Sequence, residues 1–441
     1  MADLNLDWRL TRLPNGLRLI SIARPHTPTV AVRVYVRAGS RYDLERGTSP
    51  SRHPPLGLAH LVEHLLFKGT HQHSPREMFG AVERLGGVLD GGTTKEYLTL
   101  SAVVPRQNLA TALDVLAEVL LEPALREEDF WQEKLVALEE IRHAQDREAV
   151  LFDLFASTLW QMHPLRHPIQ GTLDGLHALD YQDILTFYRQ RYVVGNTLLV
   201  LCGDAEHAEA AQCIAERFAA LAPGPEQPPA PVHEPAMSGP RTVHLEKDVH
   251  QTHLLIGVPT VSMKHEDRGA LKVMERVLGM GGSARLYQRL REQAPSVYNV
   301  NTVTAHYEDA GYFAVHTACA PENTLKVRAA ILEEWAKLRQ EWISADELSA
   351  AKSNYAGTLA CRFETNLAVA SIVGLEGLLH QVEPFDAAVQ RMNAVQREDI
   401  QRIAQTYLDV DKCVTVTVGR KAQPDDHITL GPTEVRRRAR R

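Results

Sequence analysis

The chain has 441 residues, which is enough for two or more domains of ordinary size. With 44% hydrophobic residues and a formal net charge of -7, it has the composition of a globular protein and lacks the basic excess of a nucleic-acid binder. No stretch reaches the roughly 18 uninterrupted apolar residues of a membrane span, so we expect neither nucleic acid nor a membrane as a partner.

The amino-terminal segment and the cysteines indicate a cellular compartment. Residues Met1–Trp8 include acidic residues and no apolar run, so neither a secretory signal nor a transit peptide is predicted. The five cysteines are scattered along the chain and form no C-x-x-C pair. We therefore expect a cytoplasmic protein with reduced thiols and without a cysteine-based metal site.

The first strong pattern is a helix that carries two histidines. After a strand-like alternation over Leu10–Arg37, the stretch Gly57–Thr70 has no helix breaker between its two glycines. At about 100° per residue, His60, Glu63 and His64 lie on one side of this helix. The other positions of the helix are apolar, so we expect the helix to be buried.

Two imidazoles and a carboxylate in a protein interior need partners, because burying them unpaired costs several kcal/mol. A divalent metal ion suits two histidines one turn apart, and the H-x-x-E-H spacing is the inverted form of the common zinc helix. The alternative is a pair of hydrogen-bonded core histidines beside a salt-bridged glutamate. A third ligand elsewhere in the chain is needed to favour the metal.

A second helix is predicted from Arg126 to Glu148, a segment rich in helix formers and free of glycine and proline. Glu133 and Glu140 are seven residues apart and share one face of this helix. The opposite face carries the apolar stripe that we expect to pack on the core, which consists of Trp131, Leu135, Leu138 and Ile141. The helix can therefore direct two carboxylates into a cleft.

The segment 222–240 holds seven prolines and predicts a linker, and the pattern starts again beyond it. Gly269–Gly279 repeats the histidine helix with Lys272, Glu275 and Arg276 in place of His, Glu and His. Two other segments of the first half also recur in the second half, both at the same distance along the sequence. The sequence therefore predicts an α+β fold of two homologous, duplicated α/β-sandwich domains, each with a mixed sheet packed with helices.

We place the metal-binding domain in residues 1–221 and the homologous, metal-free domain in residues 241–430. The second domain has its own candidate pair, Arg291 and Tyr298, seven residues apart. The last segment, residues 431–441, is a basic tail that we expect to be a solvated end.

These residues together support a family resemblance. An H-x-x-E-H helix, a glutamate 76 residues beyond its second histidine and another glutamate seven residues earlier resemble the pitrilysin family of zinc metallopeptidases. The chain is similar to the half-size branch, which includes the mitochondrial processing peptidase and many bacterial enzymes. The resemblance implies one zinc ion per chain with His60, His64 and Glu140 as ligands, Glu63 as the catalytic base and Glu133 as a supporting acidic residue.

The chemistry of the ligands agrees with this resemblance. Two neutral imidazoles and one carboxylate leave one tetrahedral position open for water, as in a catalytic zinc site. Zinc lowers the pKa of that water to about 7, and Glu63, a neighbour that is not a ligand, can take its proton. Manganese and cobalt also suit this set of ligands, so the sequence leaves the metal open.

The resemblance also gives roles to residues outside the two helices. Arg291 and Tyr298 match an arginine and tyrosine that the family places across the chamber from the zinc, where Arg291 grips a substrate carbonyl and Tyr298 donates to the oxyanion. The alternative is a helix-surface cation and an ordinary strand tyrosine. Asp90-Gly91 stands where the family usually has Asn-Ala on an edge strand, so Asp90 is either a substrate contact or a turn residue.

The resemblance implies an endopeptidase that acts on unfolded peptides enclosed between two halves like a clamshell. One chain supplies half of such a chamber, which implies a homodimer with the Arg291/Tyr298 pair acting in trans, or a heterodimer with a related metal-free subunit. The alternative function is a non-catalytic family member that binds peptides or serves as a scaffold, and the intact zinc-site residues argue against it. An unrelated zinc hydrolase would not explain the repeated halves.

Overall fold

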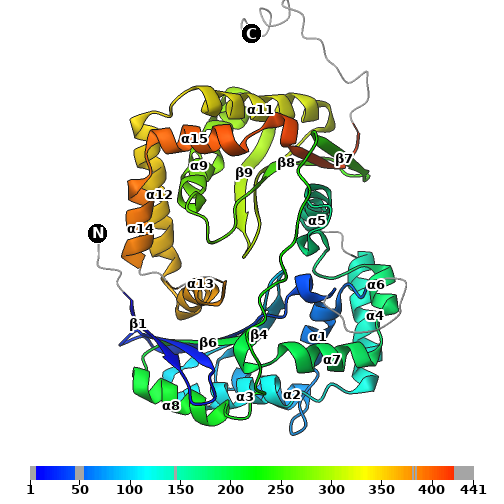
Figure 1. Cartoon of the computed structure of the whole chain (residues 1–441), viewed down its shortest axis with the longest axis vertical. Coiled ribbons are helices and arrows are strands. Elements are labelled where there is room, and N and C mark those ends of the chain that lie inside the picture. The colour runs from blue at the N-terminus through cyan, green and yellow to red at the C-terminus, as the bar shows by residue number, and fades with distance from the viewer. Residues whose placement is uncertain (1–5, 45–53, 144–146, 380–381, 383–384, 422–441) are drawn as a thin grey trace, which may run out of the picture.

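The computed structural model describes residues 6–44, 54–143, 147–379, 382 and 385–421. The chain forms two halves, each built on a mixed β-sheet that is packed with helices (Figure 1). This arrangement confirms the predicted α+β class with two similar halves.

The first sheet provides the frame of the histidine helix. In the described residues it has six strands in the spatial order β1-β2-β6-β3-β5-β4. β2 and β6 are parallel, whereas the other neighbours are antiparallel. The bounds of the strands are β1 Asp7–Arg12, β2 Arg18–Ala23, β3 Thr29–Val36, β4 Val88–Thr93, β5 Leu98–Pro105 and β6 Thr197–Gly203. β6 is buried along its whole length, as expected for a central, Leu- and Val-rich strand covered on both faces.

The second sheet repeats the first one. Its order, within the residues that the structure describes, is β7-β11-β8-β10-β9, and β7 is parallel to β11 as β2 is to β6. The bounds are β7 Arg241–Glu246, β8 Thr252–Thr260, β9 Val297–His306, β10 Gly311–Cys319 and β11 Val414–Gly419. In this correspondence β9 is the equivalent of β4, and each of them lies at one edge of its sheet. The sequence prediction of a duplication is thereby confirmed.

The helices follow the same duplication. In the first half they are α1 Leu58–Leu66, α2 Pro75–Glu83, α3 Leu109–Leu121, α4 Glu127–His143, α6 Leu173–Ala178, α7 Tyr181–Arg191 and α8 His207–Arg217. In the second half they are α9 Arg268–Gly279, α10 Arg285–Tyr287, α11 Thr324–Gln340, α12 Ala345–Arg362, α14 Phe385–Ala394 and α15 Arg397–Tyr407. A π-helical segment, Gln288–Gln293, continues α10.

Two helices are exchanged between the halves. α5 (Arg147–Leu159) packs on β8 and β11 of the second sheet, and α13 (Asn366–Leu379) packs on β3 and β6 of the first (Figure 1). Gly374 of α13 lies so close to the first sheet that a Cβ atom would overlap the ring of Tyr35. The Tyr35 hydroxyl donates to the Ser371 carbonyl of the same helix at 3.0 Å. Each half therefore supplies the helix that covers the other half's sheet.

The structure corrects the prediction of one helix over residues 126–148. α4 ends at His143 and α5 begins at Arg147, and residues 144–146 lie outside the described residues. The predicted core stripe is also wrong in part, because Trp131 is 51% and Leu135 is 64% exposed. α4 instead buries Phe130, Glu133, Lys134, Ala137 and Leu138. The core-facing side of α4 thus includes the carboxylate of Glu133, because that group has partners in the interior.

The segment 222–240 contains no helix or strand. Glu226 within it lies 3.1 Å from the buried Arg37 at the end of β3, which fixes the segment to the first half. The division into residues 1–221 and 241–430 stays a prediction, and the basic tail 431–441 lies outside the described residues. Among the helices that the structure describes, none combines the length and apolar character needed to cross a bilayer.

Candidate metal centre

The histidine helix α1 begins at a glycine and is capped from a distance. Gly57 has a φ of 98°, and a Cβ atom there would lie 2.7 Å from the Gln170 carbonyl oxygen, so only glycine suits this helix start. The two carboxylate oxygens of the buried Asp43 accept from the backbone N–H groups of Gly57 and Ala59, at 2.8 and 2.9 Å. Burial raises the pKa of Asp43 to about 7, although these hydrogen bonds act in the opposite direction.

The structure brings the predicted ligands together. Nε2 of His60 lies 3.3 Å from Nε2 of His64, and the Glu140 carboxylate oxygens lie 3.9 and 3.8 Å from these two nitrogens. One ligand atom from each of the three residues lies within 4.8 Å of the other two. All three side chains are partly buried. The helices α1 and α4 pack on each other, so the ligands face one another across their contact.

The protonation of the two imidazoles suits metal binding. Burial, and then the neighbouring His64, lower the pKa of His60 to about 4, so His60 is neutral at pH 7. Nδ1 of His64 lies 2.9 Å from Oε2 of Glu133, and the tautomer that donates from Nδ1 to this carboxylate offers Nε2 as a ligand. Oε1 of the buried Glu133 lies 2.5 Å from Nζ of Lys68. Glu133 therefore orients a candidate ligand and does not itself join the metal cluster.

Two imidazole nitrogens and one carboxylate, with a second carboxylate hydrogen-bonded to one imidazole, are the donors that zinc prefers in catalytic sites. The residues present therefore fit a zinc ion. Lys68 was not singled out from the sequence, and it follows the histidine helix without any spacing that would mark it as a partner of Glu133.

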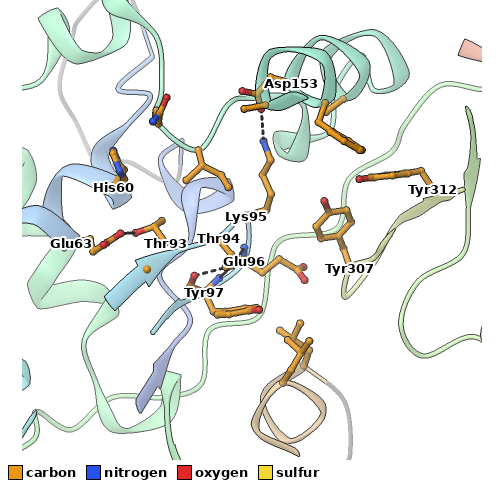
Figure 2. A pocket seen from close by; sticks show the side chains of 18 of the residues that line it. His60, Glu63, Thr93, Thr94, Lys95, Glu96, Tyr97, Asp153, Tyr307 and Tyr312 are labelled. Carbon is orange, nitrogen blue, oxygen red and sulfur yellow. Dashed lines mark hydrogen bonds and ion pairs between the residues drawn. The ribbon is translucent and has the colours of Figure 1, made fainter. Parts of the chain in front are cut away.

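Glu63 lies on the same helix but binds a different element. The hydroxyl of Thr93 in β4 donates to Oε2 of Glu63 at 2.5 Å (Figure 2). Burial raises the pKa of Glu63, whereas the hydrogen bond from Thr93 lowers it. A carboxylate in such a position can accept a proton near neutral pH more readily than an exposed one. Sequence reasoning missed Thr93, because its contact with Glu63 depends on how the strand packs against the helix.

Two cavities flank β4 beside the candidate metal site. The larger, of about 1050 Å³, is lined by Glu63, by Gly92–Tyr97, by α5 and by Tyr307 and Tyr312 of the second sheet (Figure 2). It therefore lies between the two halves.

The smaller cavity, of about 460 Å³, is lined by Glu63, Phe67, Phe79, Asp90 and Gly91 among others. Asp90 lies inside β4 opposite Ser101, so the reading of Asp90 as a turn residue is wrong. β4 thus separates two cavities that both reach Glu63.

The predicted pair of the second half, Arg291 and Tyr298, lies away from the candidate metal site of the same chain. The Cζ atom of Arg291 lies 4.9 Å from the ring centroid of Tyr298, so the structure brings the two residues together. Tyr298 is 75% exposed at the start of β9. Neither residue lines the two cavities beside the candidate metal site. Within one chain, this pair therefore faces outward.

Comparisons with known proteins decide the family. Residues 18–173 match the insulinase family (peptidase family M16), and residues 178–355 match the M16 inactive domain. An uncharacterized zinc protease of Mycobacterium leprae is 30% identical over 403 residues, which cover 90% of this chain and 89% of the relative. The chain belongs to peptidase family M16. This membership confirms the resemblance to the half-size branch of the pitrilysin family.

Other relatives of this M16 protein agree. The probable mitochondrial-processing peptidase subunit beta of Arabidopsis thaliana is 27% identical over 93% of this chain and 78% of the relative. The structure of a protease from Helicobacter pylori has a TM-score of 0.86 at 24% identity, covering 94% of this chain and all of that one. An M16 inactive domain from Pseudomonas fluorescens has a TM-score of 0.85 at 21% identity, covering 95% and 98%. These two structures support the fold alone.

Proposed function

We propose that this M16 protein is a zinc-dependent endopeptidase that cleaves unfolded peptides in a chamber between its halves. The observation that carries the proposal is the position of His60, His64 and Glu140, whose ligand atoms lie within 4.8 Å of one another. Glu63 lies on the helix of the two histidines, and a cavity of about 1050 Å³ lies beside them. One zinc ion per chain would be held by these three ligands. A cytoplasmic location stays a prediction from the sequence.

When bound, a zinc ion supplies Lewis-acid chemistry, which lowers the pKa of water and polarises a carbonyl group. Glu63 takes a proton from the attacking water and passes it to the leaving amine. Glu133 keeps His64 in the tautomer that offers Nε2. In this proposal the aromatic side chains of Tyr307 and Tyr312, which line the larger cavity, limit the access of water to the reacting bond.

The substrate binds as an added strand in this proposal. β4 pairs with β5 on one side, and in the described residues no strand pairs with its other side. An extended peptide can form backbone hydrogen bonds with such an edge, which tolerates many sequences. Its side chains would alternate between the two cavities that flank β4.

We further propose a homodimer in which Arg291 and Tyr298 act on the partner's zinc site. The exposure of Tyr298 and its separation from the cavities at His60 and Glu63 support action in trans. In that position Arg291 grips a substrate carbonyl and Tyr298 donates a hydrogen bond to the oxyanion. A heterodimer with a related metal-free subunit is the alternative outcome.

The test is hydrolysis of a quenched fluorescent peptide library by the purified chain, with the metal content measured on the same sample. We expect cleavage that o-phenanthroline abolishes, with about one zinc per chain. E63Q should keep the metal and lose turnover, whereas H60A should lose both. Unchanged hydrolysis by E63Q would contradict the mechanism, and bound zinc without hydrolysis would favour a peptide-binding subunit.

A further inference from the structure

A hydrogen bond joins the edge strand to the proposed general base. The hydroxyl of Thr93 donates to Oε2 of Glu63 at 2.5 Å, and the backbone N–H of Thr93 binds the same carboxylate. Thr93 is the last residue of β4, and Figure 2 shows it beside Glu63. The strand that borders both cavities therefore also holds the group that moves the proton.

The metal-free half contains the equivalent residues with different bonding. Glu275 of α9 stands at the position of Glu63, and Thr304 of β9 lies on the strand equivalent to β4. The backbone N–H of Thr304 donates to Oε1 of Glu275 at 3.0 Å, so both halves have a backbone tether. The Thr304 hydroxyl, however, accepts a hydrogen bond from Lys272, whose Nζ also lies 3.2 Å from Oε2 of Glu275.

This difference distinguishes a hydrogen bond that serves the packing of the fold from one that serves the proposed chemistry. The backbone tether is common to both halves, so it belongs to the packing of helix against edge strand. Among the described residues, a threonine hydroxyl donates to the carboxylate of this glutamate only in the half with the metal cluster; in the other half the Thr302 hydroxyl donates to the backbone carbonyl of Glu275. In the other half, Lys272 and Arg276 neutralise Glu275 at 3.2 and 3.6 Å. The Thr93 hydroxyl therefore donates its hydrogen bond to a carboxylate that forms no such ion pair with a lysine or arginine among the described residues.

We propose that Thr93 is a positioning residue of the peptidase, whose hydroxyl holds the Glu63 carboxylate in the orientation that proton transfer needs. This inference rests on the proposed function. A carboxylate bound through Oε2 by a hydroxyl loses its free rotation, so its remaining lone pairs keep one direction. Because β4 is also the proposed docking edge, pairing with a peptide orders Thr93 and Glu63 together.

The test compares three variants in the zinc-loaded, full-length protein. T93V removes the hydroxyl but keeps the volume, the β-branch and the backbone N–H group. We expect kcat to fall about 10- to 100-fold while KM stays within about twofold, since general-base catalysis contributes about 10²–10⁴-fold. T93S restores the hydroxyl and should return kcat to within about threefold of the wild type. T304V, the matched change in the metal-free half, should leave kcat unchanged.

A second readout does not depend on turnover. Crystal structures of T93V and wild type with equal zinc content should differ at Glu63, which we expect to occupy more than one orientation in T93V. If T93V does not fold, T93A replaces it. Wild-type kcat in the hydroxyl-free variant, a loss confined to KM, an equal loss in T93S, or a single unchanged Glu63 orientation would overturn the role of Thr93. A wild-type protein that cleaves no peptide would overturn the proposed function instead, and the crystal structures would still test the hydroxyl.

Discussion

Arg41 of the first half binds Asp309 of the second half through both carboxylate oxygens, with nitrogen–oxygen distances of 3.0 and 2.7 Å. Arg41 is 2% exposed and also binds Glu96 at 2.5 Å. The neighbouring Glu308 binds the buried Arg37. The turn between β9 and β10 is thus bound to the first half by two arginines. One of them, Arg41, is two residues before the Asp43 that caps the histidine helix.

Breaking this contact should destabilise the protein. D309N removes the charge that two nitrogens of the buried Arg41 require, so we expect the free energy of unfolding to fall by about 2–3 kcal/mol. D248N is the control, because its pair with Arg420 is exposed and should contribute less than about 1 kcal/mol. Urea unfolding, followed by tryptophan fluorescence, measures both. Equal midpoints for the two variants would show that the Arg41–Asp309 contact does not hold the halves together.

Two adjacent glycines in β4 should differ in their effect on substrate preference. A Cβ atom at Gly91 would overlap Cε2 of Phe67, whereas one at Gly92 has Thr99 Oγ1 at 3.9 Å as its nearest neighbour. G91A should therefore push the Phe67 ring into the smaller cavity and disfavour bulky side chains there by about tenfold in kcat/KM. Cleavage of a library that varies one position at a time measures this. G92A should keep the wild-type preference at the substrate position that fills the smaller cavity, because Gly92 lines only the larger of the two. An unchanged preference at that position in G91A would contradict the role of Phe67.

Complementation tests whether Tyr298 acts in trans. E63Q and Y298F should each be inactive or strongly impaired as homodimers. When the two variants are co-expressed, half of the dimers are mixed and each mixed dimer has one site with both Glu63 and Tyr298. We expect recovery of about a quarter of the wild-type activity. No recovery, with mixed dimers demonstrated by distinct tags, would place the pair in cis or remove it from the mechanism.

One ion pair predicts that the stability of the protein changes with pH. Arg285 binds Glu347 at 2.5 and 3.0 Å, and these hydrogen bonds lower the pKa of Glu347 to about 2. Because the folded pKa lies below the ordinary value of about 4.3, the pair stabilises the protein above that value and loses its effect as the pH falls toward 2. The difference in melting temperature between wild type and E347Q should therefore be largest above pH 5 and shrink toward pH 3. A constant difference would show that the charge of Glu347 is not responsible.

Part of the candidate site and of the fold could be predicted from patterns in the sequence alone. The positions of His60, Glu63 and His64 on one side of a helix follow from 3.6 residues per turn, and so does the sharing of one face by Glu133 and Glu140. The repetition of the pattern in the second half indicated the duplicated fold. In each case the deciding relation joins residues within one helix, or compares one segment with another, and needs no knowledge of packing.

The same reasoning failed where packing decides. Trp131 and Leu135 fit an apolar stripe, but the contact of α4 with α1 selects the face that carries Phe130 and Glu133 for burial. Helical periodicity defines faces without saying which of them meets the core. The charged Glu133 is buried because it has two partners there: His64 on the neighbouring helix α1, and Lys68 in the segment that follows α1.

The sequence by itself indicated the candidate site: two imidazoles and two carboxylates at spacings that fit the zinc site we propose. Only the tertiary structure decided what surrounds them, including the Asp43 cap, the Thr93 hydroxyl, the exchange of α5 and α13 and the outward position of Tyr298. The physical reason is the distance along the chain between the residues that interact. Helical spacing is fixed by local backbone geometry, whereas these contacts join separate elements that meet only when the sheets and helices pack.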